Sequence, residues 1–292
     1  MVRSQQAPPK KKLGVEHVLL IIIGILVIFL IIRVAGGLPF LGKKLTRATV
    51  CIISSSSGYQ AVVKSNPDQL ANFIINLQTA RYTVLTYGDD LNTLSYQIIK
   101  DRLDRCNLII ITNFKRVSQV LLNALYDYVQ HGGRLIIIGD SLTERYIPGI
   151  NGSNTGYIEN LFGMQFNLKY NPATGTYSVQ ILEDNNPELI VFEPNNPIFK
   201  DCVPQEGKLR LHGLVKYVEV TDYDIDLLAW IKGSHGSRPA ILEKQYGAGT
   251  VVIFTYDPLK YTPCILANTI SYLVLGKSRF GLFGVTIPSK IF

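Results

Sequence analysis

Residues 106 to 141 read CNLIIITNFKRVSQVLLNALYDYVQHGGRLIIIGDS, and this stretch decides the fold. Its two ends, CNLIIITN and RLIIIGDS, are short apolar runs that predict strands covered on both faces, as central strands of a parallel sheet are. Between them, residues 117 to 130 predict an amphipathic helix that ends before Gly132-Gly133. Its apolar face consists of Val120, Leu121, Ala124, Leu125 and Val129. A strand, a helix and a strand in this order predict a βαβ unit and a parallel sheet.

The same alternation extends toward the N-terminus. ATVCIISS at 48 to 55 and YTVLTY at 82 to 87 predict two further strands. Asn66 as the cap and Pro67 in the first turn predict the start of a helix between them. A second helix is expected over residues 94 to 103, before the strand at 106. The sequence therefore predicts an α/β domain.

Beyond Ser141 the alternation of predicted strands and helices stops. Residues 142 to 205 resemble an insertion: a Gly/Asn-rich stretch, a short helical segment near Leu161, and polar, Pro-containing loops. Regular patterns return with LVKYVEV (214 to 220), DLLAWIK (226 to 232) and RPAILEKQY (238 to 246). Gly247-Ala248-Gly249 predicts a hairpin turn into TVVIFTY. A final helix is expected over residues 263 to 275, followed by a C-terminal tail at 277 to 292.

A hydrophobic segment precedes the domain. After a basic tail at 1 to 12, residues 18 to 32 read VLLIIIGILVIFLII, and residues 13 to 42 together are long enough to cross a bilayer. This predicts a single transmembrane anchor in the cell membrane, with the lipid bilayer as its partner. A cleaved signal peptide and a pilin-type leader remain alternatives. Lys10 to Lys12 before the span favour a cytoplasmic N-terminus and an extracytoplasmic domain.

The positive charge belongs to the anchor. Residues 1 to 47 hold eight of the 29 Lys and Arg residues and one of the 22 Asp and Glu residues, so that 21 of each remain for the rest of the chain. Basic residues beside a span contact anionic headgroups. The neutral domain gives no reason to expect nucleic acid as a partner.

Two pieces of the chain, 128 to 141 and 246 to 258, carry a resemblance to a known family. A helix, YVQHGGRLIIIGDS, an insertion, YGAGTVVIFTYDP and a helix resemble membrane-anchored domains of the class I glutamine amidotransferase-like (GIFT-type) fold, over about residues 47 to 276. The resemblance implies a flavodoxin-like, three-layer domain with a mostly parallel sheet and a ligand cleft at the carboxyl ends of the strands. It also implies noncatalytic roles in larger membrane assemblies.

The residues of amidotransferase chemistry are replaced. The family's G-x-C-x-G turn reads Gly139-Asp140-Ser141-Leu142-Thr143 here, and Asp257 follows the strand after which the family places its His and Glu. A thiolate nucleophile needs a base and an orienting carboxylate, so we expect this chemistry to be absent. The expected ligand-binding cleft is lined by four residues, namely Gly139, Asp140, Ser141 and Asp257.

GDSL at 139 to 142 also matches the nucleophile block of the GDSL esterases, which leaves one catalytic alternative. Ser141 would be the nucleophile of an extracytoplasmic serine hydrolase, with His212 or His235 as a distant base. Neither histidine has the family's D-x-x-H spacing, and a turn or cap role is the ordinary one for Ser in this position.

Four cysteines lack C-x-x-C spacing, so neither a metal site nor a redox motif is expected, and no cofactor is predicted. We expect Cys51 to be an inert buried thiol. Cys202 and Cys264 lie near loops and could be bridged or reduced. The sequence as a whole predicts a noncatalytic, membrane-tethered binding or scaffold domain with protein partners in a membrane or cell-surface assembly.

Overall fold

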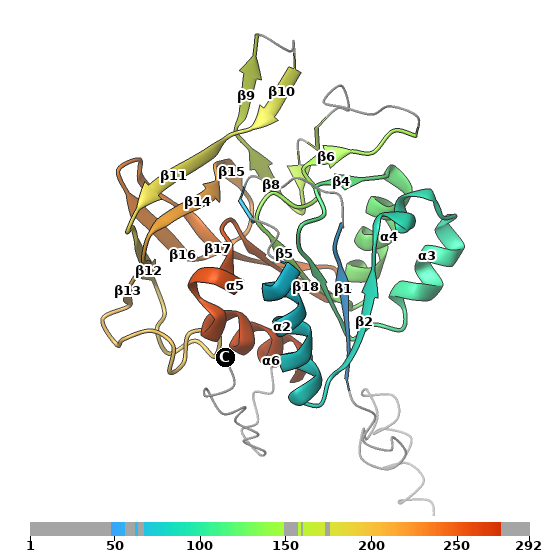
Figure 1. The fold of residues 1–292 in the computed structure, drawn as a ribbon, viewed down its shortest axis with the longest axis horizontal. Coiled ribbons are helices and arrows are strands. Elements are labelled where there is room, and N and C mark those ends of the chain that lie inside the picture. Colours follow the sequence, from blue (N-terminus) through green and yellow to red (C-terminus); the bar gives the residue numbers. More distant parts are fainter. Residues whose placement is uncertain are drawn as a thin grey trace, which may run out of the picture. The chain divides into compact units, whose positions relative to one another are not determined.

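A nine-stranded sheet organises the computed structural model (Figure 1). The structure describes residues 48–55, 62–63, 67–148, 157–158, 160–172 and 176–275. The basic tail (1–12), the anchor (13–42) and the C-terminal tail (277–292) expected from the sequence lie outside these ranges. Among the helices within them, none is both long and apolar enough to cross a membrane.

One half of the sheet is parallel. Its strands are β1 (Thr49–Ile53), β2 (Thr83–Tyr87), β3 (Leu108–Ile111), β5 (Arg134–Ile138) and β18 (Gly249–Phe254). They lie in the order β2-β1-β3-β5-β18. This is the flavodoxin-like order, with β1 and β3 side by side at the point where the winding reverses. The predicted α/β fold and its flavodoxin-like order are confirmed.

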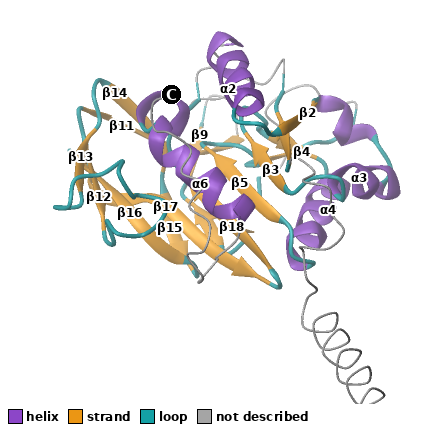
Figure 2. Cartoon of the chain, turned by 90° about the horizontal axis from the view of Figure 1, so that it is seen from below, coloured by secondary structure: helices purple, strands orange, loops and turns teal. Residues whose placement is uncertain are grey.

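Helices cover both faces of this half (Figure 2). They are α2 (Pro67–Thr79), α3 (Tyr96–Leu103), α4 (Gln119–Gln130), α5 (Pro258–Tyr261) and α6 (Pro263–Leu275). Successive strand side chains point to opposite faces. Along β3, Ile109 packs with the α3 and α4 side chains, whereas Ile110 packs with those of α2 and α6. The domain therefore has three layers.

Helix α4 agrees closely with the amphipathic helix predicted for residues 117 to 130. Its N-terminus is capped by Ser118, whose Oγ accepts the Leu121 N–H at 3.2 Å. Four of the five residues predicted for its apolar face are buried, but Val120 is exposed and Leu122 is buried in its place. The buried stripe is thus rotated slightly around the helix relative to the prediction.

The other half of the sheet is antiparallel. Strands β17 (Gly236–Tyr246), β16 (Asp226–Gly233), β12 (Glu188–Val191) and β13 (Lys208–Arg210) continue it beyond β18. The predicted hairpin is confirmed: Tyr246 pairs with Gly249, and Gly247 has a φ of 61°. The sheet is therefore mixed rather than mostly parallel.

The segment 142–205 differs from the prediction. Instead of a helix near Leu161 and polar loops, it contains β6 to β12. These strands, other than β12, are β6 (Glu144–Arg145), β7 (Asn160–Leu161), β8 (Met164–Phe166), β9 (Leu168–Asn171), β10 (Thr176–Val179) and β11 (Ile181–Asn185). Met164 and Phe166 are buried and Gln165 is exposed. This period of two is the strand signal that the helical interpretation missed.

Three further strands complete the small sheets around the insertion. They are β4 (Arg116–Val117), which pairs with β6, β14 (Leu214–Val218), which pairs with β11, and β15 (Val220–Tyr223), which pairs with β8. The insertion therefore folds onto segments on both sides of it in sequence.

Both cysteine pairs are bridged. The prediction of an inert Cys51 thiol is wrong, because Cys51 is bonded to Cys106. The pairing of β1 with β3 explains this: Asn107 N donates to Thr49 O at 2.8 Å and brings Cys106 beside β1. The second bridge joins Cys202 to Cys264.

Candidate functional site

The carboxyl ends of the parallel strands are where ligands bind in open α/β sheets. The topology brings the predicted site residues to this edge, since Gly139 to Ser141 follow β5 and Asp257 follows the neighbouring β18. The two strand ends are tied together, because Gly139 N donates to Phe254 O at 2.8 Å. The side chains themselves are inside the protein.

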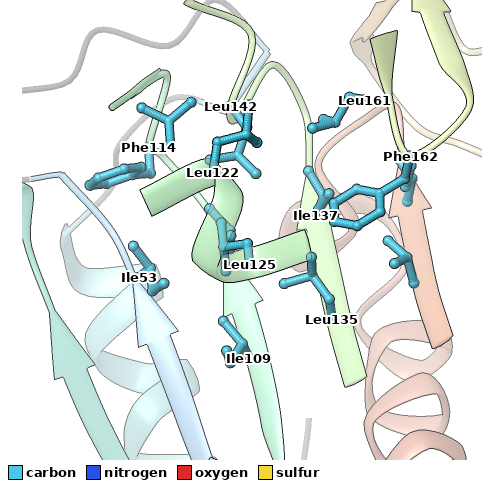
Figure 3. Close-up of a cluster of buried hydrophobic side chains, with 14 of the residues drawn as sticks. Ile53, Ile109, Phe114, Leu122, Leu125, Leu135, Ile137, Leu142, Leu161 and Phe162 are labelled. Atoms are coloured by element: carbon cyan, nitrogen blue, oxygen red, sulfur yellow. The ribbon is translucent and has the colours of Figure 1, made fainter. Parts of the chain in front are cut away.

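Ser141 is fully buried, at 0% exposure. Its Oγ donates to the Ile138 carbonyl at 2.7 Å. The strained position of the turn is the next residue, Leu142, which has a φ of 60°. Figure 3 shows the Leu142 side chain among Phe114 and Leu122 in the apolar cluster between the sheet and α4.

A non-glycine residue at positive φ costs about 1–3 kcal/mol and persists only when its surroundings fix it. Two contacts fix Leu142: its buried side chain, and its N–H, which donates to Phe114 O at 2.8 Å. In a nucleophile elbow the nucleophile itself occupies the strained turn. Here that conformation belongs to an apolar residue.

Gly139 and Asp140 are covered by the chain that follows β1. Gly139 has a φ of 63°, and a Cβ there would lie 3.0 Å from Val63 and 3.2 Å from Val62. Asp140 is buried and its Oδ1 accepts the Val62 N–H at 3.3 Å. Only glycine fits this close approach in this backbone conformation.

A charged network continues from Asp140. Lys115 Nζ lies 3.9 Å from Asp140 Oδ2 and 3.0 Å from Glu144 Oε1. Arg116 Nε lies 3.3 Å from Glu144 Oε2. Cationic side chains of the protein itself therefore lie beside both buried carboxylates.

Asp257 is buried as well, at 3% exposure. Its Oδ1 accepts the Leu259 N–H at 3.0 Å and so caps the short helix α5. Burial raises the pKa of Asp257 to about 6, although hydrogen bonds from the backbone of Lys260 and Leu259 act against this. The ionised carboxylate is thus held in an environment that disfavours it.

One residue at the switch point between β1 and β3, Asn113, was missed by the sequence analysis. Asn113, at a φ of 53°, donates from Nδ2 to Ser55 O at 2.9 Å. Ser55 N donates to Asn113 O at 3.0 Å, and Ser55 Oγ donates to Asp89 Oδ2 at 2.7 Å. An Asn directly after a buried strand is the signal that could have identified this corner, because Asn tolerates the left-handed conformation.

The structure does not bring His212 to Ser141. His212 follows β13, which is five strands from β5, or about 24 Å at the usual strand spacing. His235 lies in the turn between β16 and β17, where its Nδ1 is 3.3 Å from Asp184 Oδ1.

Three cavities are lined by described residues, with volumes of about 240, 340 and 370 Å³. None of these three is lined by Gly139, Asp140, Ser141 or Asp257. The described part of the chain holds no group of three or more His, Cys, Asp or Glu placed to bind a metal ion.

Comparison with known proteins identifies the fold. No protein-family model matches the sequence, and no curated protein is similar to it in sequence. The structure is similar to that of a ThuA-like protein from Bacteroides uniformis, with a TM-score of 0.55 and 14% identity over 83% of this chain and 97% of that one. It is also similar to a β-galactosidase from Rahnella sp. R3, with a TM-score of 0.53 and 14% identity.

The second match covers 79% of this chain but only 32% of that β-galactosidase. At these identities the likeness shows the fold alone, which is a flavodoxin-like α/β fold.

Proposed function

We propose that this chain is a noncatalytic, membrane-tethered domain that binds a protein partner within a larger membrane or cell-surface assembly. The observation that carries the proposal is the turn after β5. The Ser141 hydroxyl is buried and bonded to a carbonyl, and Leu142 holds the strained position. A nucleophile must be accessible to its substrate and its base. The strained position of this turn therefore carries no reactive side chain.

The two disulfides support an extracytoplasmic location for the domain. Disulfides persist in oxidising compartments and are rare in the cytosol of most organisms. Both bridges join residues far apart in the sequence, at separations of 55 and 62. We propose that the domain lies outside the membrane that residues 13–42 would span.

The positions of the first and last described residues are consistent with a tether attached at one edge of the sheet. Ala48 precedes β1, and Val274 O accepts a hydrogen bond of 2.8 Å from Arg134 Nη1 at the start of β5. The first and last described segments therefore both lie at the amino edge of the parallel strands. The β9–β10 hairpin projects at the opposite end of the domain (Figure 1).

This hairpin carries the surface that we propose for the partner. Tyr170 and Tyr177 face each other across its two strands, with ring centroids 5.1 Å apart, and each is 51% exposed. Exposed Tyr side chains are enriched at protein interfaces and often dominate their binding energy. The hairpin lies at the opposite end of the described domain from Ala48 and Val274 (Figure 1), and its exposed rings are accessible to another protein.

The test is recovery of companion proteins from gently solubilised membranes of the source organism. The wild-type chain should recover specific companions, and a Tyr170→Ser/Tyr177→Ser variant should lose them. Ile75→Ser is the matched control, because Ile75 is an exposed apolar residue, at 55%, on α2. Equal recovery by the hairpin variant would contradict the assignment of the surface, and no specific companion for the wild type would contradict the proposed function.

The competing function is an extracytoplasmic serine hydrolase that uses Ser141. A fluorophosphonate probe decides between the two, because it reacts with activated serines. We expect no modification of Ser141 in the folded protein. Stoichiometric labelling of wild type that is abolished by Ser141→Ala would overturn the noncatalytic proposal.

A further inference from the structure

The loop 192–207, between β12 and β13, forms one wall of the 340 Å³ cavity. Its contribution consists of Phe192, Glu193, Asn196 and Phe199. The opposite wall is formed by residues 226–228 of β16 and by Glu243 of β17. The size of this cavity therefore depends on how firmly the loop is held.

Three kinds of contact hold the loop. At its base, Val191 N donates to Gly207 O at 2.7 Å. In its middle, Phe199 is fully buried in the apolar core. Toward its end, the Cys202–Cys264 disulfide joins it to the first turn of α6.

Asn268 adds a polar contact beside this disulfide. Its Nδ2 donates to Lys200 O at 2.7 Å and lies 3.2 Å from Cys202 Sγ. Asn268 is one helical turn after Cys264 on α6, so the amide and the disulfide attach the loop to the same helix face. The disulfide is the covalent part of this attachment.

The two disulfides differ in how a reductant could reach them. Cys51 is fully buried within the sheet and Cys106 is 8% exposed. Cys202 and Cys264 are both partly exposed at the surface between the loop and α6. Thiol–disulfide exchange requires a thiolate to contact a sulfur, so accessibility separates the two bridges.

We propose that Cys202–Cys264 is a thiol–disulfide exchange site, and that its reduction by a dithiol loosens the loop 192–207 and thereby changes the cavity that the loop lines. This inference does not rest on the proposed function.

The exchange takes place in two steps. One thiolate of the dithiol attacks Cys202 Sγ, the bond to Cys264 breaks, and the electron pair leaves on Cys264 Sγ. This sulfur lies in the first turn of α6, where peptide dipoles stabilise a thiolate. The second thiolate of the dithiol then displaces Cys202 Sγ, which Asn268 can hydrogen-bond. The dithiol is oxidised to a disulfide, and the two protein thiolates take up the protons that the dithiol lost.

The first experiment compares the two bridges in the folded full chain, purified in detergent without reductant. The chain is treated with increasing dithiothreitol, quenched with N-ethylmaleimide, and digested for mass spectrometry. We expect Cys202 and Cys264 to be labelled first, and Cys51 and Cys106 only after denaturation. Labelling of the buried pair first, or of all four cysteines together, would overturn the proposal. Free Cys202 and Cys264 thiols before any reductant is added would do the same.

The second experiment measures amide hydrogen exchange in the oxidised and selectively reduced protein. Reduction should accelerate exchange in peptides from the loop by about tenfold or more and leave α4 unchanged, because local opening free energies differ between segments. A Cys202→Ser/Cys264→Ser variant should behave like the reduced protein. If that variant fails to fold, the reduced wild type still provides the comparison. Unchanged exchange in the loop after reduction would show that the bridge does not control it.

Discussion

Replacing Asp257 by Asn tests whether the protein retains a carboxylate at the expense of its stability. Burial raises the pKa of Asp257 from 3.8 to about 6. A difference of about two pKa units corresponds to about 3 kcal/mol in favour of the protonated form. The Asn amide oxygen can accept the same Leu259 N–H bond, and Asn and Asp are comparable helix caps. The substitution therefore removes the charge and keeps the cap.

The sign of the pH dependence follows from the raised pKa. Between about pH 4 and pH 6 the folded protein binds more protons than the unfolded chain, so its stability falls as the pH rises through this window. Below about pH 4 Asp257 is protonated in both states and costs nothing. We expect Asp257→Asn to raise the free energy of unfolding by about 3 kcal/mol near pH 7.5 and to leave it unchanged near pH 4.

Urea denaturation at both pH values measures this difference. Asp222→Asn is the matched control, because Asp222 is exposed on β15 and its replacement should have little effect at either pH. A loss of stability near pH 7.5, or a gain that is the same at both pH values, would refute the argument that burial raises the pKa of this carboxyl group.

Three further variants test the contacts that hold the domain together. Burial alone would raise the pKa of Asp184, but hydrogen bonds lower it to about 2. The ionised carboxylate therefore stabilises the fold above about pH 4, and this contribution disappears toward pH 2. Asp184→Asn should lower the free energy of unfolding by about 2 kcal/mol at neutral pH and should weaken the pH dependence of acid unfolding, which circular dichroism follows. Cys51→Ser/Cys106→Ser removes a disulfide that closes a loop with a sequence separation of 55. The free energy of unfolding should therefore fall by about 4 kcal/mol, which a lower urea midpoint would report. Ser118→Ala removes the bond to the Leu121 N–H and should cost about 1 kcal/mol in the same assay.

The parallel half of the fold could be predicted because each element carries its own pattern. The central strands are apolar throughout, and the final helix begins and ends at Pro263 and Leu275, as expected. The insertion could not be predicted in the same way, because its strands are short and pair with segments distant in sequence. β11 pairs with β14, for example, and β8 with β15.

The edge at which the site residues lie was predictable, but their burial was not. Strand order alone places Asp140 and Asp257 at the carboxyl ends of neighbouring strands. Nothing in the sequence indicates that Val62 would lie against Gly139, or that Leu142 would hold the strained position of the turn. Both depend on tertiary contacts.

The position of the first disulfide determines how the domain would respond to tension. A pulling force applied through the chain before Ala48 would reach the Cys51–Cys106 disulfide after only Thr49 and Val50 of β1. Strand β1 lies between β2 and β3 and is parallel to both, so pulling along its axis shears two ladders at once instead of peeling them open bond by bond. A domain suspended from its N-terminal end would resist being drawn out strand by strand.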